Sequence, residues 1–272
     1  MQVNVGSSGF WVRSHMLEQD KCIIGEAYHS DCYRLRALAK HLNPRVIMDI
    51  GAHIGAFTRL AKELFPNAQA YALEPNPSSF ELLQMNTAGL SQCTLIQRAL
   101  VYDRDRDVLL LAQSSAGGAV VVSDGEAEAI LAGTAVEHGT RRSRIFFKPD
   151  GSVDGERDRG WTEETYHRAD LAVSGTTLEA LMEEYVVDYV DLLKLDCEGC
   201  EMAMLNHIDP GTAERIGVMV GEVHLRAGSE TFRDQFQSRF PPSPSAGSWR
   251  RSLAALLGSA ERGDVTPAVS HP

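Results

Sequence analysis

The stretch from Asp49 to Glu74 combines residue types that suit a nucleoside cofactor. Asp49 ends a short apolar run, and Gly51 and Gly55 stand in the turn that follows it. Glycine permits positive φ and leaves room for a ligand against the backbone, while the free N–H groups that open the next helix attract polar ligand groups. Glu74 follows after about one βαβ unit, where a carboxylate can accept hydrogen bonds from both ribose hydroxyls. The residues expected to contact the cofactor are Asp49, Gly51, Ala52, His53, Gly55, Glu74 and Pro75.

The glycine spacing distinguishes between classes of cofactor. A dinucleotide site has the pattern GxGxxG around a pyrophosphate, whereas the pattern here is GxxxG preceded by an acid. S-adenosylmethionine (SAM) has a carboxylate, an amine, a sulfonium and a ribose but no phosphate, so an acid in the loop favours its binding. SAM is therefore the expected cofactor, and a nicotinamide oxidoreductase is the competing hypothesis. A structural alternative also stays open, in which Asp49 and Glu74 are only strand-end acids of a generic α/β protein.

A second group of titratable residues follows two later apolar runs and suits the acceptor side of a methyl transfer. Asp196 and Glu198 follow one run, while Glu222 and His224 lie two apart in another and would share one face of a strand. Methyl transfer requires an aligned acceptor and a group that accepts one proton. His224 is the first choice for this base because an ordinary imidazole has a pKa near ~6.5, and Glu198 or Asp196 is the second choice.

Two other roles for these residues remain open. Asp196 and Glu198 could cap the following helix or orient its loop. Asp196, Glu222 and His224 could together bind a divalent cation, since carboxylate and imidazole groups are suitable ligands. Their spacing matches no metal signature, so we expect no metal.

The elements that would position these residues alternate between strands and helices. Short apolar runs without polar alternation are typical of strands buried on both faces, and they predict a doubly wound, mostly parallel sheet of the Rossmann-like α/β class. The expected strands are 46–50, 70–73, 94–96, 190–195 and 218–223, and the expected helices are 30–42, 57–65, one capped by Ser78 or Ser79, and 176–185. Ligands of such sheets bind outside the carboxyl ends of the strands, where both groups of residues fall.

The regions that depart from this alternation suggest domain boundaries. Residues 1–43 are expected to form an N-terminal helical cap, and residues 44–225 the catalytic core. Within the core, residues 103–175 are interpreted as an antiparallel insertion before the fourth strand, with a long mobile loop around 124–167. Residues 226–272, rich in proline, are expected to be an irregular and partly disordered tail.

Composition limits the possible partners and compartments. The chain of 272 residues has 26 Lys and Arg against 37 Asp and Glu, a formal net charge of −11, which argues against nucleic acid as the substrate. Its five cysteines form no disulfide framework, although Cys197 and Cys200 form a CxxC pair for which metal or redox use is a minor alternative. No signal peptide or membrane span is evident, so the expected location is cytoplasmic and reducing, with no membrane partner.

Four segments together resemble the FkbM-type methyltransferases, over roughly residues 45–225. They are Asp49-Ile-Gly-Ala-His-Ile-Gly-Ala-Phe-Thr58, Ala72-Leu-Glu-Pro-Asn-Pro77, Asp191-Leu-Leu-Lys-Leu-Asp-Cys-Glu-Gly-Cys-Glu201 and Gly221-Glu-Val-His224. The third is the most specific, because few other methyltransferases carry KxDxEGxE on the fourth strand. The resemblance implies a class I SAM-dependent fold and methyl transfer, usually to a hydroxyl oxygen of a natural product or sugar.

The sequence departs from the family pattern in two places. Residues 124–167 are longer than the usual insertion, and the segment after His224 lacks two final strands, which would leave the edge of the fifth strand exposed. The sequence therefore predicts a SAM-dependent O-methyltransferase acting on a small molecule or sugar. The alternative is a SAM-binding protein with degenerate or absent activity. The oligomeric state is undetermined.

Overall fold

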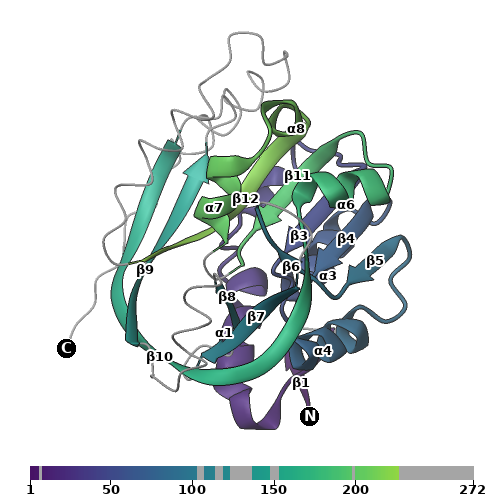
Figure 1. The fold of residues 1–272 in the computed structure, drawn as a ribbon. Helices are drawn as coiled ribbons and strands as arrows, with labels where there is room; N and C mark the ends of the chain where they lie inside the picture. Colours follow the sequence, from purple (N-terminus) through teal and green to yellow (C-terminus); the bar gives the residue numbers. More distant parts are fainter. Residues whose placement is uncertain are drawn as a thin grey trace, which may run out of the picture.

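The centre of the protein is a parallel sheet of five strands. The computed structural model describes residues 1–5, 8–102, 107–113, 119–122, 137–147, 153–197 and 200–226. The strands lie in the order β5 (Cys93–Ile96), β4 (Gln69–Leu73), β3 (Val46–Ile50), β11 (Val190–Leu195) and β12 (Ile216–Arg226). All four neighbouring pairs are parallel, which confirms the predicted fold class (Figure 1). The winding reverses between β3 and β11, and such a switch point is where ligands bind in open α/β sheets.

Helices cover both faces of this sheet, because its strands are apolar on both sides. One face packs against α1 (Leu17–Tyr28), α2 (Leu35–Leu38), α3 (Ala56–Leu64) and α4 (Pro77–Thr87). The other packs against α6 (Leu178–Glu184), α7 (Glu201–His207) and α8 (Pro210–Glu214). In β3, Ile47 faces the first layer and Met48 the second, each 1 % exposed. This double burial explains the unbroken apolar run.

The helices that follow β3 and β4 begin at the carboxyl ends of these strands. Gly55 precedes α3 in the left-handed conformation, at φ +87°. Asn76 caps α4, because its Oδ1 accepts the Ser78 N–H at 3.0 Å and Pro77 takes the first helical position. The prediction of a cap at Ser78 or Ser79 was wrong: Ser79 is buried inside the first turn.

The N-terminal segment forms more than a helical cap. β1 (Gln2–Val5) and β2 (Ser8–Trp11) pair as an antiparallel hairpin, and a 3-10 turn η1 (Ser14–Met16) leads into α1. The predicted helix 30–42 was wrong in extent: only Leu35–Leu38 is α-helical, and Arg34 before it has φ +55°. Of the apolar residues that suggested a longer helix, Leu35 and Leu38 lie in this short helix, while Ala39 and Leu42 follow it and pack against the same core. Phe10 and Ile24 share one buried core with Phe57 of α3, so the segment belongs to the main body.

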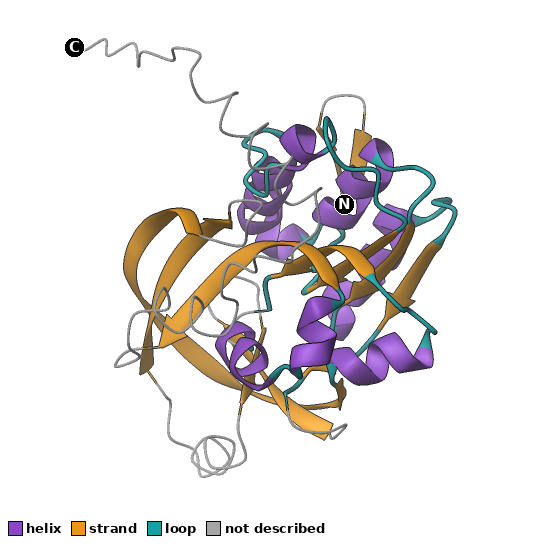
Figure 2. Cartoon of the chain, turned by 90° about the horizontal axis from the view of Figure 1, so that it is seen from above, coloured by secondary structure: helices purple, strands orange, loops and turns teal. Residues whose placement is uncertain are grey.

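The insertion forms antiparallel strands, as the sequence predicted, and these strands continue the sheet beyond β12. β12 is followed across the sheet by β9 (Glu137–Phe147), β10 (Val153–Thr176), β7 (Asp107–Gln113) and β8 (Ala119–Val122), while β6 (Ala99–Leu100) pairs with the end of β10. The long curved ribbons of β9 and β10 extend away from the helical layers (Figures 1 and 2). The expected loop at 124–167 was wrong in extent, because β9 and much of β10 lie within it. These two strands pair with each other, and each also pairs with a strand more distant in the chain, β9 with β12 and β10 with β7.

The edge of β12 is partly covered. Residues 222–226 pair with β9 antiparallel, from Glu222 opposite Arg144 to Arg226 opposite Thr140. The expectation that this edge is exposed is therefore wrong for this part of the strand. The tail predicted at 226–272 lies, beyond Arg226, outside the described residues.

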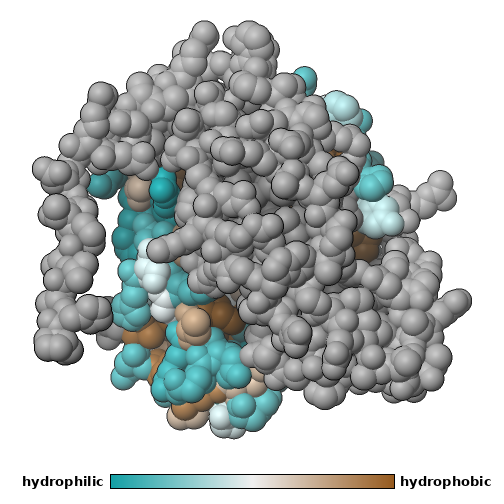
Figure 3. Space-filling view, turned by 90° about the vertical axis from the view of Figure 1, so that its left-hand side faces the viewer, coloured by the Kyte–Doolittle hydropathy of each residue, from teal (hydrophilic) through white to brown (hydrophobic). Residues whose placement is uncertain are grey.

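The described surface is mixed in character. In Figure 3, hydrophilic side chains alternate with small hydrophobic areas on the part of this face that is not grey. Large exposed hydrophobic residues of the described chain are few: Met1, Trp11, Met85, Tyr102 and Val186. None of the described helices has the length and hydrophobicity needed to cross a membrane.

Candidate active site

The turn between β3 and α3 is shaped by close contacts within the protein. Gly51 has φ +78°, and a Cβ there would lie 1.8 Å from the backbone oxygen of Asp196. A Cβ on Gly55 would lie 2.8 Å from Cδ1 of Leu83 in α4. We expected the missing side chains to leave room for a ligand, but the structure gives another reason. Both glycines let the turn pack against β11 and α4, which fixes its shape before any ligand binds.

Glu74 lies beside this turn, at the carboxyl end of β4. Its side chain is buried, and its Oε2 accepts the backbone N–H of His53 at 2.8 Å while Oε1 accepts that of Asn76 at 2.9 Å. Burial raises the pKa of Glu74 from 4.5 to about 7, although these two hydrogen bonds act in the opposite direction. A carboxylate has about four acceptor positions, so Glu74 retains capacity for further donors. Pro75 then directs the chain toward Asn76 and α4.

Asp49 has quite different partners from those of Glu74. It is 1 % exposed and lies directly beside Lys194 in the β3–β11 register, with 3.1 Å between Lys194 Nζ and Asp49 Oδ1. Thr58 of α3 donates to Oδ2 at 2.5 Å. Burial alone would lower the pKa of Lys194, but the carboxylates of Asp49 and Asp196 raise it above its ordinary value. The charge of Asp49 is therefore balanced by Lys194 within the protein. The two acids that were expected to bind the cofactor together have different partners in the structure.

Asp196 lies where β11 ends and receives a donor that the sequence did not suggest. The hydroxyl of Tyr33 donates to Asp196 Oδ2 at 2.5 Å, and Lys194 Nζ lies 3.9 Å from the same oxygen. Burial, and then the charge of Asp196, raise the pKa of Tyr33 well above 10, so the phenol stays protonated and remains a donor. Tyr33 belongs to the segment before β3, and no spacing in that segment indicates a contact with Asp196.

The other expected acceptor-side residues are described only in part. Glu198 lies outside the described residues, and so does the side chain of His224, whose backbone in β12 pairs with Arg142 of β9. Glu222 is buried in the same strand. Among the residues that the structure describes, no three His, Cys, Asp or Glu side chains are grouped to hold a metal ion.

Comparison with known proteins agrees with this geometry. The family model described as the methyltransferase FkbM domain matches residues 49–261. The chain belongs to the FkbM methyltransferase family. A curated relative, the methyltransferase sdnD of Sordaria araneosa, is 26 % identical over 217 residues, which cover 76 % of this chain and 75 % of the relative. The resemblance found in the four sequence segments is thus confirmed, and the protein is a methyltransferase.

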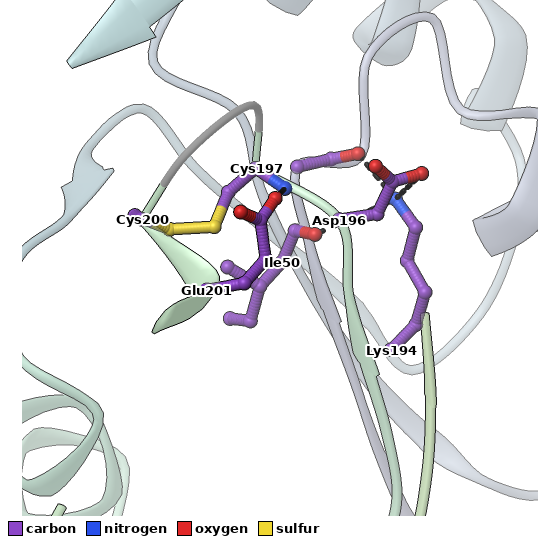
Figure 4. The surroundings of a disulfide bond; sticks show 7 residues. Ile50, Lys194, Asp196, Cys197, Cys200 and Glu201 are labelled. Atoms are coloured by element: carbon purple, nitrogen blue, oxygen red, sulfur yellow. Dashed lines mark hydrogen bonds and ion pairs between the residues drawn. A yellow bond between two sulfur atoms is a disulfide. The ribbon is translucent and has the colours of Figure 1, made fainter. Parts of the chain in front are cut away.

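In this FkbM methyltransferase the family signature on β11 contains a disulfide. Cys197 and Cys200 are joined, with their Cα atoms 5.7 Å apart, immediately after Asp196 (Figure 4). The Cys197 N–H donates to Oε1 of the buried Glu201 at 2.8 Å. The expectation of reduced thiols was wrong for this pair, because their Cα separation lies within the range that a disulfide spans. Cys200, and neither Asp196 nor Glu198, occupies the position before α7.

The methyltransferase also has site contacts that come from outside the family match. The match begins at Asp49, yet Tyr33 contacts Asp196, and Arg13 contacts His53 in the glycine turn. Sequence reasoning missed both residues. Their side chains reach the site only because the N-terminal segment folds back across α3.

Proposed function

We propose that this FkbM methyltransferase transfers a methyl group from SAM to a hydroxyl oxygen of a small molecule or sugar. The observation that carries the proposal is the position of Glu74. It lies beside a rigid glycine turn, on the strand next to the switch point, with unused acceptor capacity and a pKa raised to about 7 by burial. A hydroxyl pair that donates to this buried carboxylate would stabilise its charge.

The residues present fit SAM in an arrangement that differs from the simplest sequence expectation. Glu74 would accept the ribose hydroxyls, and the turn from Gly51 through Ala52 and His53 to Gly55 would contact the rest of the nucleoside, with Pro75 beside it. Asp49 would act indirectly, since Lys194 and Thr58 engage it. When bound, SAM supplies a methyl group already activated by the sulfonium.

On the acceptor side, one residue has to accept the proton of the attacking hydroxyl. We propose His224, with Glu198 and Asp196 as second choices. Asp196 already accepts the Tyr33 hydroxyl, which favours His224. The Lys194–Asp196–Tyr33 group lies at the carboxyl end of β11, where it would orient the acceptor beside the cofactor.

Calorimetry with SAM, its demethylated product and NAD tests the cofactor, and a screen of hydroxyl compounds tests the acceptor. We expect SAM and its product to bind, NAD not to bind, and at least one hydroxyl compound to be methylated. Binding of NAD alone would overturn the proposal. Binding of SAM without turnover would favour a protein with degenerate activity, an alternative that was motivated by an exposed β12 edge and is weakened by the pairing with β9.

Replacing the proposed base separates catalysis from binding. We expect His224→Ala to lower turnover by about 10²-fold or more, the usual contribution of a general base, while the Kd for SAM changes little. Steady-state kinetics with the best acceptor from the screen measures this. Intact turnover would place the base elsewhere.

A further inference from the structure

The N-terminal segment contains an ion pair that is buried next to the glycine turn. Arg13 is 8 % exposed and Asp20 0 %. Arg13 donates to Asp20 from Nη2 at 2.5 Å, from Nε at 3.2 Å and from its backbone N–H at 2.7 Å. Removing two charges from water is costly, so a buried ion pair is by itself weak evidence for a role in stability. The guanidinium of Arg13 also contacts residues near the glycine turn, and these contacts indicate what the pair does.

The other contacts of Arg13 lead to the cofactor turn. Nη2 lies 2.8 Å from His53 Nε2, and Nη1 donates to Ser79 Oγ of α4 at 3.3 Å. A guanidinium has only donors, so Nε2 of His53 must accept, and the proton of the neutral ring lies on Nδ1. The arginine therefore fixes both the position and the tautomer of this imidazole.

His53 is also the residue through which the turn contacts Glu74. Its backbone has φ +51°, a left-handed conformation that is uncommon without glycine, and its N–H donates to Glu74 Oε2 at 2.8 Å. A continuous chain of contacts thus runs from Asp20 through Arg13 and His53 to Glu74. A residue in a sparsely populated conformation needs surrounding contacts to hold it there, and Arg13 provides one.

We propose that Arg13, held by Asp20, is a positioning residue for the cofactor: it fixes His53 and thereby aligns Glu74 and the glycine turn. The inference rests on the proposed use of SAM. It makes the segment before the family match part of the cofactor site, although neither residue touches the cofactor. Loss of the contact would weaken SAM binding while turnover at saturating SAM is largely retained.

The test uses the double variant Arg13→Met/Asp20→Leu in the full chain, because removing Arg13 alone would leave a buried, unpaired carboxylate. We expect the Kd for SAM to rise about tenfold or more and kcat at saturating SAM to change less than threefold. The matched control is Arg59→Met. Arg59 of α3 also holds the N-terminal segment, donating to the Gly9 carbonyl at 2.6 Å and lying 4.6 Å from the centre of the Phe10 ring. Its backbone N–H donates to the Gly55 carbonyl of the turn at 2.9 Å, a helix hydrogen bond that the substitution retains.

Arg59→Met should leave the Kd for SAM within twofold of the wild type. Equal losses of affinity in the control and the double variant would overturn the positioning role in favour of general packing. Nitrogen-15 NMR of the His53 ring provides a readout independent of SAM. We expect the Nδ1–H tautomer in the wild type and a tautomer mixture in the double variant, and identical spectra would overturn the proposal. A wild type that binds no SAM would instead refute the proposed function.

Discussion

The carboxyl ends of β3 and β4 each present a buried acid, and the two acids are used differently. Asp49 on β3 lies 3.1 Å from the Lys194 ammonium and accepts the Thr58 hydroxyl. Glu74 on β4 accepts two backbone N–H groups and has a pKa of about 7. Because Lys194 of the neighbouring strand balances its charge, Asp49 has a structural role. The carboxyl group of Glu74 has only backbone N–H donors among these partners, so its protonation can change when a ligand binds.

The difference originates in strand register. Lys194 is the direct neighbour of Asp49 in the parallel β3–β11 pair, so both side chains project from the same face and meet over α3. On the other side of β3, the neighbour of Asp49 is Ala72. Glu74 lies two residues beyond Ala72, after the last residue of β4, so it is not level with Asp49 and has no strand cation beside it in this register. The two acids therefore have different electrostatic surroundings.

The largest effect that this comparison predicts is on stability. Lys194→Met leaves the Asp49 carboxylate buried without its cation, and we expect the free energy of unfolding to fall by about 3–5 kcal/mol. Urea denaturation measures the change. Adding Asp49→Asn should restore much of the loss, because the uncompensated charge is removed. A double variant as unstable as the single one would show that the charge pair is not what matters.

A smaller effect is expected at β4, and on affinity. Glu74→Ala should weaken SAM binding by about 1–3 kcal/mol, the scale of lost polar contacts, while unfolding is affected less than in Lys194→Met. Calorimetry and urea denaturation of the same preparations give both values. If the Kd for SAM were unchanged, Glu74 would not bind the ribose, and the contrast between the two acids would have no functional meaning.

The smallest expected effect is the pH dependence of binding. The pKa of Glu74 is about 7 in the free protein, and ribose donors favour its charged form, so binding at lower pH must first release a proton. The Kd for SAM should be nearly constant above pH 8 and about tenfold higher at pH 6, as expected for one titrating group. Glu74→Gln should bind more weakly and lose this dependence. A wild-type Kd that is constant from pH 6 to 8 would contradict the role of the buried carboxylate.

Much of the core was predictable from the sequence because its pattern is local. The run at Val46–Ile50 is apolar on both faces, and Gly55 followed by helical periodicity marks the start of α3, so the first βαβ unit follows directly. The N-terminal segment was less predictable. The spacing of Leu35, Leu38 and Leu42 predicts a helical face over 30–42, yet only Leu35–Leu38 is α-helical, and Leu42 packs against the core from outside that helix. The same helical periodicity occurs in α3, where it forms a full helix, and in residues 30–42, where it forms one only in part. Tertiary packing decides between the two outcomes.

By itself, the sequence determined the α/β class, the elements of the first βαβ unit and the family. Buried parallel strands, glycine turns and strand-end acids all leave local patterns in the sequence. Only the tertiary structure decided which acid is neutralised by Lys194, that Tyr33 meets Asp196, and that Arg13 supports His53. Each of these contacts joins segments that are distant in the chain and meet only in the folded protein. The charge and pKa of a buried group depend on such neighbours, and spacing along the chain does not reveal them.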